Sequence, residues 1–208
     1  MKKKVDLLVA TSNPGKIREI RRLLKGTGLR VAWLQTLGDA CPPAPKETGR
    51  TFAQNARLKA RSYATRCGFV TFSEDSGLCV EMLGGAPGYL SARYLGMGAS
   101  YDQRCRHVLR LLEGKPRRLR RASFQAAGAV VDPAGRVLFE ATGRCPGLIA
   151  YAMSGRRGFG YDPIFYYPPA RKTFAQMAAA EKNAVSHRAR LLAKLRRFLV
   201  RSSARSGS

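Results

Sequence analysis

The sequence predicts a mixed α/β fold, in which strands and helices share one sheet without strict alternation. Short apolar stretches such as 5–10 and 69–72 are typical of buried strands. Longer stretches with apolar residues three and four positions apart, such as 17–24 and 191–199, are typical of amphipathic helices. Two apolar segments around the turn DPAG (132–135) predict a hairpin. Together these patterns favour a mixed sheet over a purely doubly wound one.

The N-terminal half supplies two helices and several strands. After the first strand, the turn TSNPGK leads into a helix whose apolar face is Ile17, Ile20, Leu23 and Leu24, and Gly26 is a plausible stop. A second strand is expected within 29–34, and PPAPKETG (42–49) reads as a loop. Thr51 is expected to open the next helix. The apolar face of that helix comprises Phe52, Ala56, Ala60 and Tyr63.

The second half begins at SEDSG, where we expect the strand 69–72 to end in a tight turn. Leu78, Val80 and Met82 alternate as in a strand that GGAPG interrupts. The expected elements that follow are a helix at 101–113, hairpin strands at 124–131 and 136–141, and a glycine-rich loop at 155–163. Ser186 is a candidate cap for the last helix, which buries Leu191, Leu192, Leu195, Phe198 and Leu199.

The chain length allows one large domain or two lobes that share a core. We expect a single domain over 1–200 and a disordered tail at 201–208 (RSSARSGS). No apolar run approaches the roughly 20 residues of a membrane helix. Asp6 interrupts the short apolar stretch after the N-terminal lysines, which argues against a signal peptide. We therefore expect a cytoplasmic protein without membrane contact.

The positions of the cysteines and histidines indicate which kind of metal the protein could bind. The five cysteines are scattered, none forms a C-x-x-C pair, and reduced structural thiols are expected. His107 and His187 lie far apart in the sequence, so the pattern does not favour zinc. Any bound metal would be a hard cation held by carboxylates.

The charge balance is strongly basic. There are 38 lysines and arginines, 27 of them arginine, against 13 acidic residues, which gives a net charge of +25. This predicts a polyanionic partner, either a nucleotide or a nucleic acid. The basic residues are spread along the whole chain, so a solvated arginine-rich surface is an equally weighted interpretation.

The loop VATSNPGK (9–16) joins a strand to a helix, where backbone N–H groups and the helix dipole favour phosphate. Lys16 would add charge in the first helical turn, and Asn13 would offer an amide. The loop is not a P-loop, because Ile17 follows Gly15-Lys16 where a hydroxyl is needed for magnesium. Taken alone, the loop is more often an ordinary turn with a surface lysine.

Glu74 and Asp75 are adjacent carboxylates at the end of an apolar strand, and we expect them side by side at a tight Ser-Gly turn. In a basic protein they favour magnesium, which takes a few carboxylates together with substrate phosphates. A carboxylate beside a metal-held water is also a candidate general base. Glu47 is a third candidate, and Asn55 and Lys59 share a helix face. A solvated turn and a solvated helix are the alternatives.

The last group lies in GFGYDP (158–163) and in SHR (186–188), with Lys182 between them. Phe159 is placed to stack on a base, and His187 and Arg188 lie at a helix start, where donors face an anion or a carbonyl. A lone histidine is more often structural than functional. The four groups nevertheless agree on one ligand, a nucleoside triphosphate with magnesium.

Five segments, taken together, closely resemble the inosine-triphosphate pyrophosphatase family. They are VATSNPGKIREI, ETGRTFAQNARLKA, EDSGLCVEMLGGAPGYLSARYLG, GFGYDPIFYYP and KTFAQMAAAEKNAVSHR, and the resemblance runs from about residue 5 to 199. It implies hydrolysis of non-standard purine nucleoside triphosphates (dITP, ITP and XTP) to the monophosphate and pyrophosphate, with magnesium. It also implies an elongated mixed sheet with two lobes around a central nucleotide-binding cleft, and a homodimer.

The resemblance assigns roles to individual residues. It implies that Glu47 and Asp75 hold magnesium and that Asp75 is the catalytic base for the attacking water. The triphosphate would contact Lys59 and the loop residues Thr11, Ser12, Asn13, Pro14, Gly15 and Lys16, and Ser76 would also touch the substrate. The base pocket would comprise Phe159, Gly160, Tyr161, Asp162, Lys182, His187 and Arg188. Its donors would favour a carbonyl at the purine six position over an amino group.

Three departures from the family pattern occur, and two of them remove negative charge. The family usually has two aspartates where Glu74 and Asp75 stand, which leaves the role of Glu74 open. Bacterial members often have glutamate at Gln54, and often have A-E-L at 175–177. Two rival functions follow: a nucleic-acid-binding protein, which the charge supports without any recognisable motif, and an inactive family member that senses nucleotides.

Overall fold

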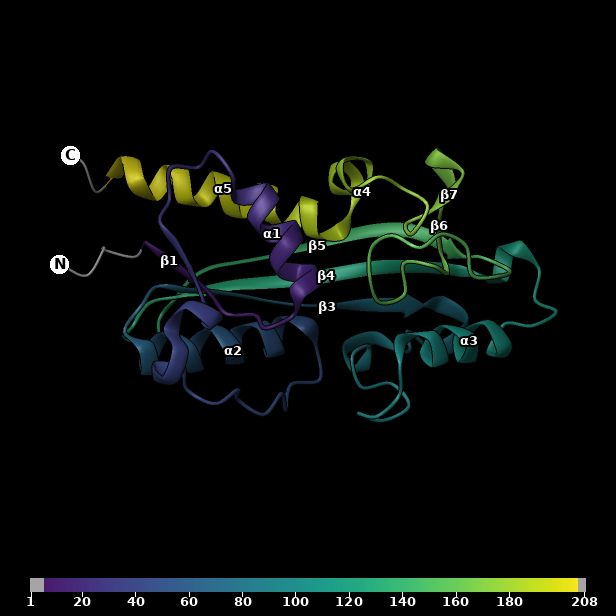
Figure 1. Ribbon diagram of the computed structural model, residues 1–208, viewed down its shortest axis with the longest axis horizontal. Coiled ribbons are helices and arrows are strands. Elements are labelled where there is room, and N and C mark those ends of the chain that lie inside the picture. Colours follow the sequence, from purple (N-terminus) through teal and green to yellow (C-terminus); the bar gives the residue numbers. More distant parts are fainter. Residues whose placement is uncertain (1–5, 206–208) are drawn as a thin grey trace. The chain divides into compact units, whose positions relative to one another are not determined.

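The computed structural model describes residues 6–205, and these form one seven-stranded sheet with helices. The strand order is β2-β1-β3-β4-β5-β6-β7. The strands are β1 (Leu7–Val9), β2 (Val31–Trp33), β3 (Thr71–Val80), β4 (Arg121–Val131), β5 (Val137–Ile149), β6 (Phe165–Tyr167) and β7 (Lys172–Thr173). The α-helices are α1 (Pro14–Leu24), α2 (Phe52–Cys67), α3 (Tyr101–Leu111), α4 (Ala179–Val185) and α5 (His187–Arg205) (Figure 1).

The sheet is mixed, as predicted. Strand β1 pairs in parallel with β2 and β3, whereas β6 pairs antiparallel with β5 and β7. The predicted hairpin joins β4 to β5 through the turn at 132–135, in which Gly135 N donates to Asp132 O at 2.9 Å. No helix within the described residues is long and apolar enough to cross a membrane.

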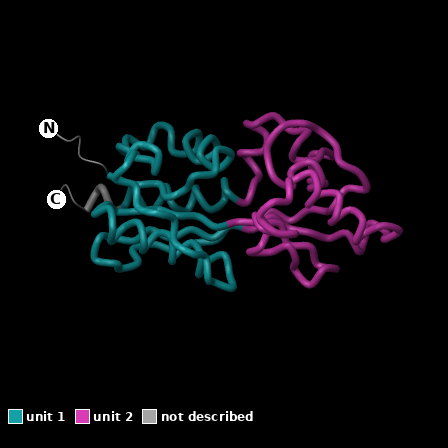
Figure 2. Tube along the Cα trace, turned by 60° about the horizontal axis from the view of Figure 1, so that its bottom comes forward, with its two compact units in different colours: residues 1–75, 126–143, 188–208 teal, residues 76–125, 144–187 magenta. Residues whose placement is uncertain are grey.

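The chain divides into two compact units (Figure 2). Unit 1 comprises residues 1–75, 126–143 and 188–208, and unit 2 comprises 76–125 and 144–187. Strands β3, β4 and β5 each contribute residues to both units. The boundary in β3 falls between Asp75 and Ser76, and the boundary before α5 falls between His187 and Arg188.

Unit 1 has a helical layer on each face of its strands. Helices α1 and α5 lie on one face, and α2 lies on the other (Figure 1). On the first face, Ile20 of α1 and Leu191 of α5 pack with Phe72 in one buried cluster. On the second face, Ala60 and Ala64 of α2 pack in a cluster with residues of β4.

Unit 2 is built around aromatic side chains. Phe124 lies within 4.6 Å of Phe165 and 5.7 Å of Phe174, measured between ring centroids. Residues of α3, including Cys105 and Val108, complete this core. The five cysteines are all free thiols, as the sequence predicts.

Three sequence-based expectations about elements are wrong. SEDSG is not a turn, because β3 continues through it to Val80. Met82 lies in a short 3-10 segment beyond that strand. The predicted tail at 201–208 is helical as far as Arg205, since neither glycine nor proline interrupts the helix before Gly207; residues 206–208 lie outside the described part of the chain.

Candidate functional site

The predicted phosphate loop leads into α1 as a capped helix start. The side chain of Asn13 accepts a hydrogen bond from Lys16 N at 3.1 Å, and Pro14 occupies the first helical position. Thr11 Oγ1 accepts from Asn13 N at 3.3 Å, which shapes the approach to the helix. With its oxygen engaged, the Asn13 amide has its nitrogen left to donate. This helix start therefore offers N–H donors and one lysine to an anion.

The carboxylates of Glu74 and Asp75 lie on opposite faces of β3, because side chains alternate along a strand. Glu74 contacts Lys16 of α1 and Arg188 of α5, whereas Asp75 contacts Asn55 and Lys59 of α2. This placement corrects the expectation that the two carboxylates lie side by side in one turn. Only Asp75 is on the face of the sheet that carries Lys59.

Asp75 belongs to a group that links β3, α2 and the loop 42–49. Lys59 Nζ lies 2.6 Å from Glu47 Oε1 and 3.5 Å from Asp75 Oδ1, so both carboxylates turn toward one amino group. Asn55 Nδ2 donates to Asp75 Oδ2 at 3.3 Å. Asn55 Oδ1 also accepts from Gly49 N at 2.9 Å, which ties the loop to the helix. The two residues predicted to hold magnesium are thus brought together within unit 1.

Glu74 belongs to a buried ion-pair group with Arg188 and Glu19. Arg188 Nε and Nη2 donate to the two carboxylate oxygens of Glu74 at 2.7 and 2.8 Å, and Arg188 Nη1 donates to Glu19. Arg188 is 1% exposed. All three guanidinium nitrogens donate to carboxylates, and the contact between Arg188 and the purine stays a prediction. The position of Arg188 assigns it to holding Glu74.

Lys16 lies against the same glutamate. Its Nζ is 3.6 Å from Glu74 Oε1 and 3.4 Å from the Glu74 carbonyl oxygen. Burial lowers the pKa of Lys16, although the charge of Glu74 opposes the shift. Burial would also lower the pKa of Lys59, but Asp75 and Glu47 outweigh it and raise the pKa. Of the two lysines in the predicted phosphate site, Lys16 therefore has the lower pKa and loses its proton at lower pH than Lys59.

Unit 2 gathers the predicted base-pocket residues around Asp162. This buried carboxylate accepts from Lys182 Nζ at 2.5 Å and from Phe159 N at 2.8 Å. The amino group of Lys182 also lies 4.8 Å from the centroid of the Phe159 ring. Gly158 has φ +77°, and a Cβ there would lie 2.0 Å from Asp162 Oδ2, so the tight loop around this carboxylate requires glycine.

Two other predicted base-pocket residues have different surroundings. His187 stacks on Phe124, with ring centroids 4.8 Å apart and an interplanar angle of 13°. Tyr161 is buried in the core of unit 2, and its hydroxyl donates to Ser91 O at 3.1 Å. The substrate contact expected of Tyr161 stays a prediction. Gly160, at φ +67°, lies between Phe159 and Tyr161 in the same loop.

The segment DSGL packs directly on GGAPGYLSAR. A Cβ on Gly77 would lie 2.2 Å from Ser91 Oγ and 2.5 Å from Gly88 O, so only glycine fits. Ser91 Oγ accepts from Leu78 N at 3.0 Å and donates to Gly88 O at 2.6 Å. This packing fixes the strand immediately after Ser76, which is half-buried.

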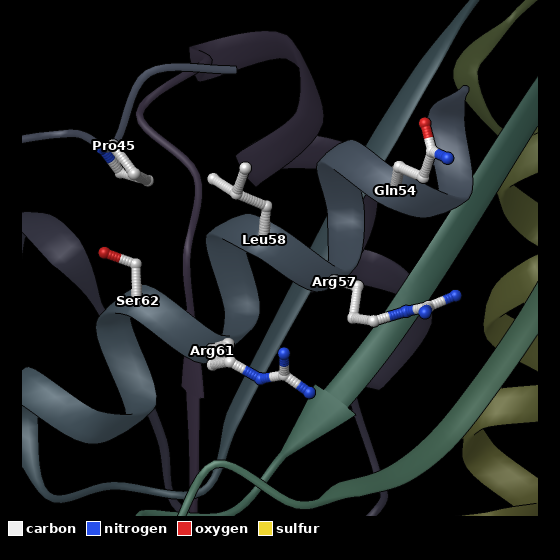
Figure 3. A pocket seen from close by; sticks show the side chains of 6 residues that line it. All are labelled: Pro45, Gln54, Arg57, Leu58, Arg61 and Ser62. Carbon is white, nitrogen blue, oxygen red and sulfur yellow. The ribbon is translucent and has the colours of Figure 1, made fainter. Parts of the chain in front are cut away.

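One cavity in unit 1 lies apart from these groups. It has a volume of about 490 Å³ and is lined by Pro45, Gln54, Arg57, Leu58, Arg61 and Ser62 (Figure 3). Arg57 pairs with Glu140 at 2.6 Å, and Arg61 Nε donates to Gly135 O at 3.1 Å. None of the predicted site residues lines this cavity, so we do not assign the nucleotide to it.

Sequence reasoning missed three contributors to these groups. Glu19 was absent from the predicted site because its position between arginines reads as part of a solvated face. Phe124 and Phe174, which contact His187 and Lys182, carry no local signal beyond strand-like apolarity. The spacing of Asn55 and Lys59 did signal a shared helix face, and both now prove to contact Asp75.

Comparison with known proteins identifies the family. A model of the Ham1 family matches residues 7–198. The chain belongs to the Ham1 family. It is similar to a protein named dITP/XTP pyrophosphatase from Gloeobacter violaceus, with 48% identity over 191 residues and 91% of each chain covered. A Geobacillus kaustophilus protein of the same name is 44% identical over 190 residues, which cover 91% of this chain and 92% of the other.

Solved structures of Ham1 proteins share the fold. A HAM1 protein from Coxiella burnetii matches with a TM-score of 0.86 and 35% identity, covering 95% of this chain and 100% of the other. A nucleoside-triphosphatase / dITP/XTP pyrophosphatase from Mycobacterium abscessus matches with a TM-score of 0.73 and 38% identity, covering 91% and 97%. The predicted α/β fold and the predicted family are therefore confirmed.

Proposed function

We propose that this Ham1 family member hydrolyses dITP, ITP and XTP to the monophosphate and pyrophosphate. The observation that carries the proposal is the position of Lys59, whose amino group contacts both Glu47 and Asp75. Two carboxylates placed this close together suit magnesium, which takes one or two carboxylates together with substrate phosphates. The substrate class rests on the relatives that are named dITP/XTP pyrophosphatase.

In unit 1, the triphosphate is bound by cations that carboxylates already hold in place. Lys16 stands at the N-terminus of α1, where backbone N–H groups add donors for phosphate oxygens. When the substrate binds, the amino group of Lys59 moves partly away from Glu47 and Asp75 and contacts the negatively charged phosphates. Both lysines neutralise charge that develops on the departing pyrophosphate.

Glu47 and Asp75 fit magnesium as its protein ligands. No group of three or more His, Cys, Asp or Glu side chains that could hold a metal occurs within residues 6–205, so phosphate oxygens and waters would complete the coordination. Magnesium bound there would supply positive charge next to the phosphate oxygens. The geometry of Asp75 and Glu47 around Lys59 supports this assignment.

Asp75 is the proposed general base. It takes a proton from a water that attacks the α-phosphorus, and the bond from that phosphorus to the bridging oxygen breaks. Pyrophosphate leaves with the electron pair of that bond. Asn55 holds the Asp75 carboxylate through Oδ2, which orients it for this role.

In unit 2, Phe159 and Lys182 are proposed to bind the purine. Phe159 supplies a ring for stacking. Lys182 is fixed by Asp162 and supplies a donor. A buried donor favours a carbonyl at the six position and is left unsatisfied by an amino group, which selects against ATP. We further propose that the protein acts as a homodimer in the cytoplasm; light scattering would test the oligomeric state.

The test is pyrophosphate release from ITP, XTP, dITP, GTP and ATP, with and without magnesium. We expect magnesium-dependent turnover of ITP, XTP and dITP, and little turnover of GTP and ATP. GTP also carries a carbonyl at the six position, so its low turnover requires a separate discrimination against its two-amino group. An Asp75→Asn variant should bind ITP and release almost no pyrophosphate. Nucleotide binding by the wild type without any turnover would instead identify a sensor.

A further inference from the structure

Two helices on one face of unit 1 carry basic side chains in regular stripes. On α1 and its C-terminal cap the stripe is Arg18, Arg21, Arg22 and Lys25, and on α5 it is Arg190, Lys194, Arg197 and Arg201. All eight side chains are exposed. The spacings of three, four and seven residues place each set on one side of its helix.

These stripes share one layer of the molecule. Helices α1 and α5 pack through Ile20, Leu24, Leu191 and Leu195 in one buried cluster, on the same face of the unit 1 strands (Figure 1). Their apolar residues face that cluster, so the basic stripes face away from it. The outer surface of this layer, comprising the eight residues above, is called the α1–α5 basic face below.

The charge of this face is not balanced on the two helices themselves. Helix α5 contains no acidic residue, and the only acidic residue of α1 is Glu19, which is buried and paired with Arg188. An ordinary solvated helix surface intersperses both signs of charge. Such a concentration of one sign attracts a polyanion and is costly without one.

We propose that the α1–α5 basic face binds the phosphate backbone of a nucleic acid duplex, independently of sequence. Six of its eight residues are arginines, whose guanidinium groups match phosphate oxygens in pairs. The α5 stripe runs from Arg190 to Arg201, which is about 16 Å along the helix axis. A duplex carries about nine phosphate charges along that length, more than the four basic side chains of this stripe.

Two observations favour a duplex over other polyanions. Proteins that hold single strands supply aromatic side chains for base stacking, and on these two helices the only aromatic residue is Phe198, which is partly buried against Phe139. Membrane-surface helices bury a broad apolar face in lipid. Within the described side chains of α1 and α5, Val200 is the only exposed large apolar residue.

The experiment measures binding of the purified wild-type protein to a labelled, random-sequence DNA duplex by fluorescence anisotropy between about 50 and 200 mM salt. The test variant carries Arg18→Gln, Arg22→Gln, Arg190→Gln and Arg197→Gln. Each lost phosphate contact should make the slope of log K against log salt shallower by about 1, so a change of about 3 to 4 is expected. Release of pyrophosphate from ITP should remain as in the wild type, which shows that the variant is folded.

The matched control removes the same charge from unit 2. It carries Arg110→Gln, Arg117→Gln, Arg118→Gln and Arg121→Gln, all at exposed positions. We expect it to keep the wild-type salt slope to within about 1. Equal losses in both variants would overturn the proposal, since binding would then follow net charge alone.

Two further outcomes also contradict the proposal. One is the absence of duplex binding by the wild type at about 50 mM salt. The other is binding to vesicles of phosphatidylcholine and phosphatidylserine, or to a single strand, with no binding to the duplex. The second outcome would assign the face to a different partner.

Discussion

The two units hold their predicted site residues by different physical means. In unit 1, Lys16 and Lys59 lie in ion pairs with Glu74, Glu47 and Asp75, so the group is made of charges that compensate one another. In unit 2, one ion pair, between Lys182 and Asp162, lies against aromatic rings. The difference suggests a division of labour. In the proposed function, unit 1 binds the triphosphate, which all nucleoside triphosphates share, and unit 2 binds the base, which distinguishes them.

The sharpest test of unit 1 is Asp75→Asn. We expect kcat to fall by about 10²- to 10⁴-fold, the contribution typical of a general base. The loss should be equal for ITP, XTP and dITP, because Asp75 acts on the phosphates. Pyrophosphate release under saturating substrate checks this, and Asp102→Asn, at an exposed position, is the control. A loss confined to one base would contradict the division between the units.

Arg188→Met tests whether that residue is structural. Removing one partner of a buried ion pair leaves Glu74 and Glu19 uncompensated, so the free energy of unfolding should fall by about 3 to 5 kcal/mol. Urea denaturation measures it. Arg106→Met breaks an exposed pair with Asp102 and should cost less than about 1 kcal/mol. If Arg188→Met left stability unchanged but altered the ratio of ITP to ATP turnover, the predicted role of Arg188 in base recognition would be supported instead.

Phe159→Leu tests unit 2. Stacking on a base contributes about 1 to 3 kcal/mol, so its loss should lower kcat/KM for ITP roughly 5- to 150-fold. The change should appear mainly in KM, since the ring is assigned to the base and not to the phosphates. Phe139→Leu, at a ring that stacks on Phe198 in unit 1, is the matched control. A fall in kcat with unchanged KM would argue that Phe159 serves the chemistry instead.

The smallest expected effect concerns the two lysines of unit 1. Burial lowers the pKa of Lys16 below its usual 10.5, so in the free enzyme this lysine loses its charge as the pH rises toward that value. The pKa of Lys59 is raised, so it stays charged over the same range. Since kcat/KM reports the free enzyme, it should fall on the alkaline side below pH 10.5. Lys16→Arg should shift that fall to higher pH, because arginine stays protonated. An unchanged profile would assign the fall to another group.

Most elements were predictable from local patterns. The helices at α1, α2, α3 and α5, and the hairpin of β4 and β5, follow from periodicity and turn residues that act within a few positions of one another. The turn expected at SEDSG was wrong, because pairing with neighbouring strands in the sheet outweighs the local turn preference of serine and glycine. The expected tail was wrong over 201–205 for a simpler reason, since polar composition alone does not end a helix.

By itself, the sequence determined the family, the α/β class and the residues that gather around Lys59 and Asp162. The motif residues made these predictions possible because their types and their order along the chain can be read directly from the sequence. Only the tertiary structure decided that Glu74 and Asp75 face opposite sides of β3, and that Arg188 pairs with Glu74 and Glu19. Those partners are 114 and 169 positions from Arg188 in the chain, and packing of distant elements, which no local pattern encodes, brings them together.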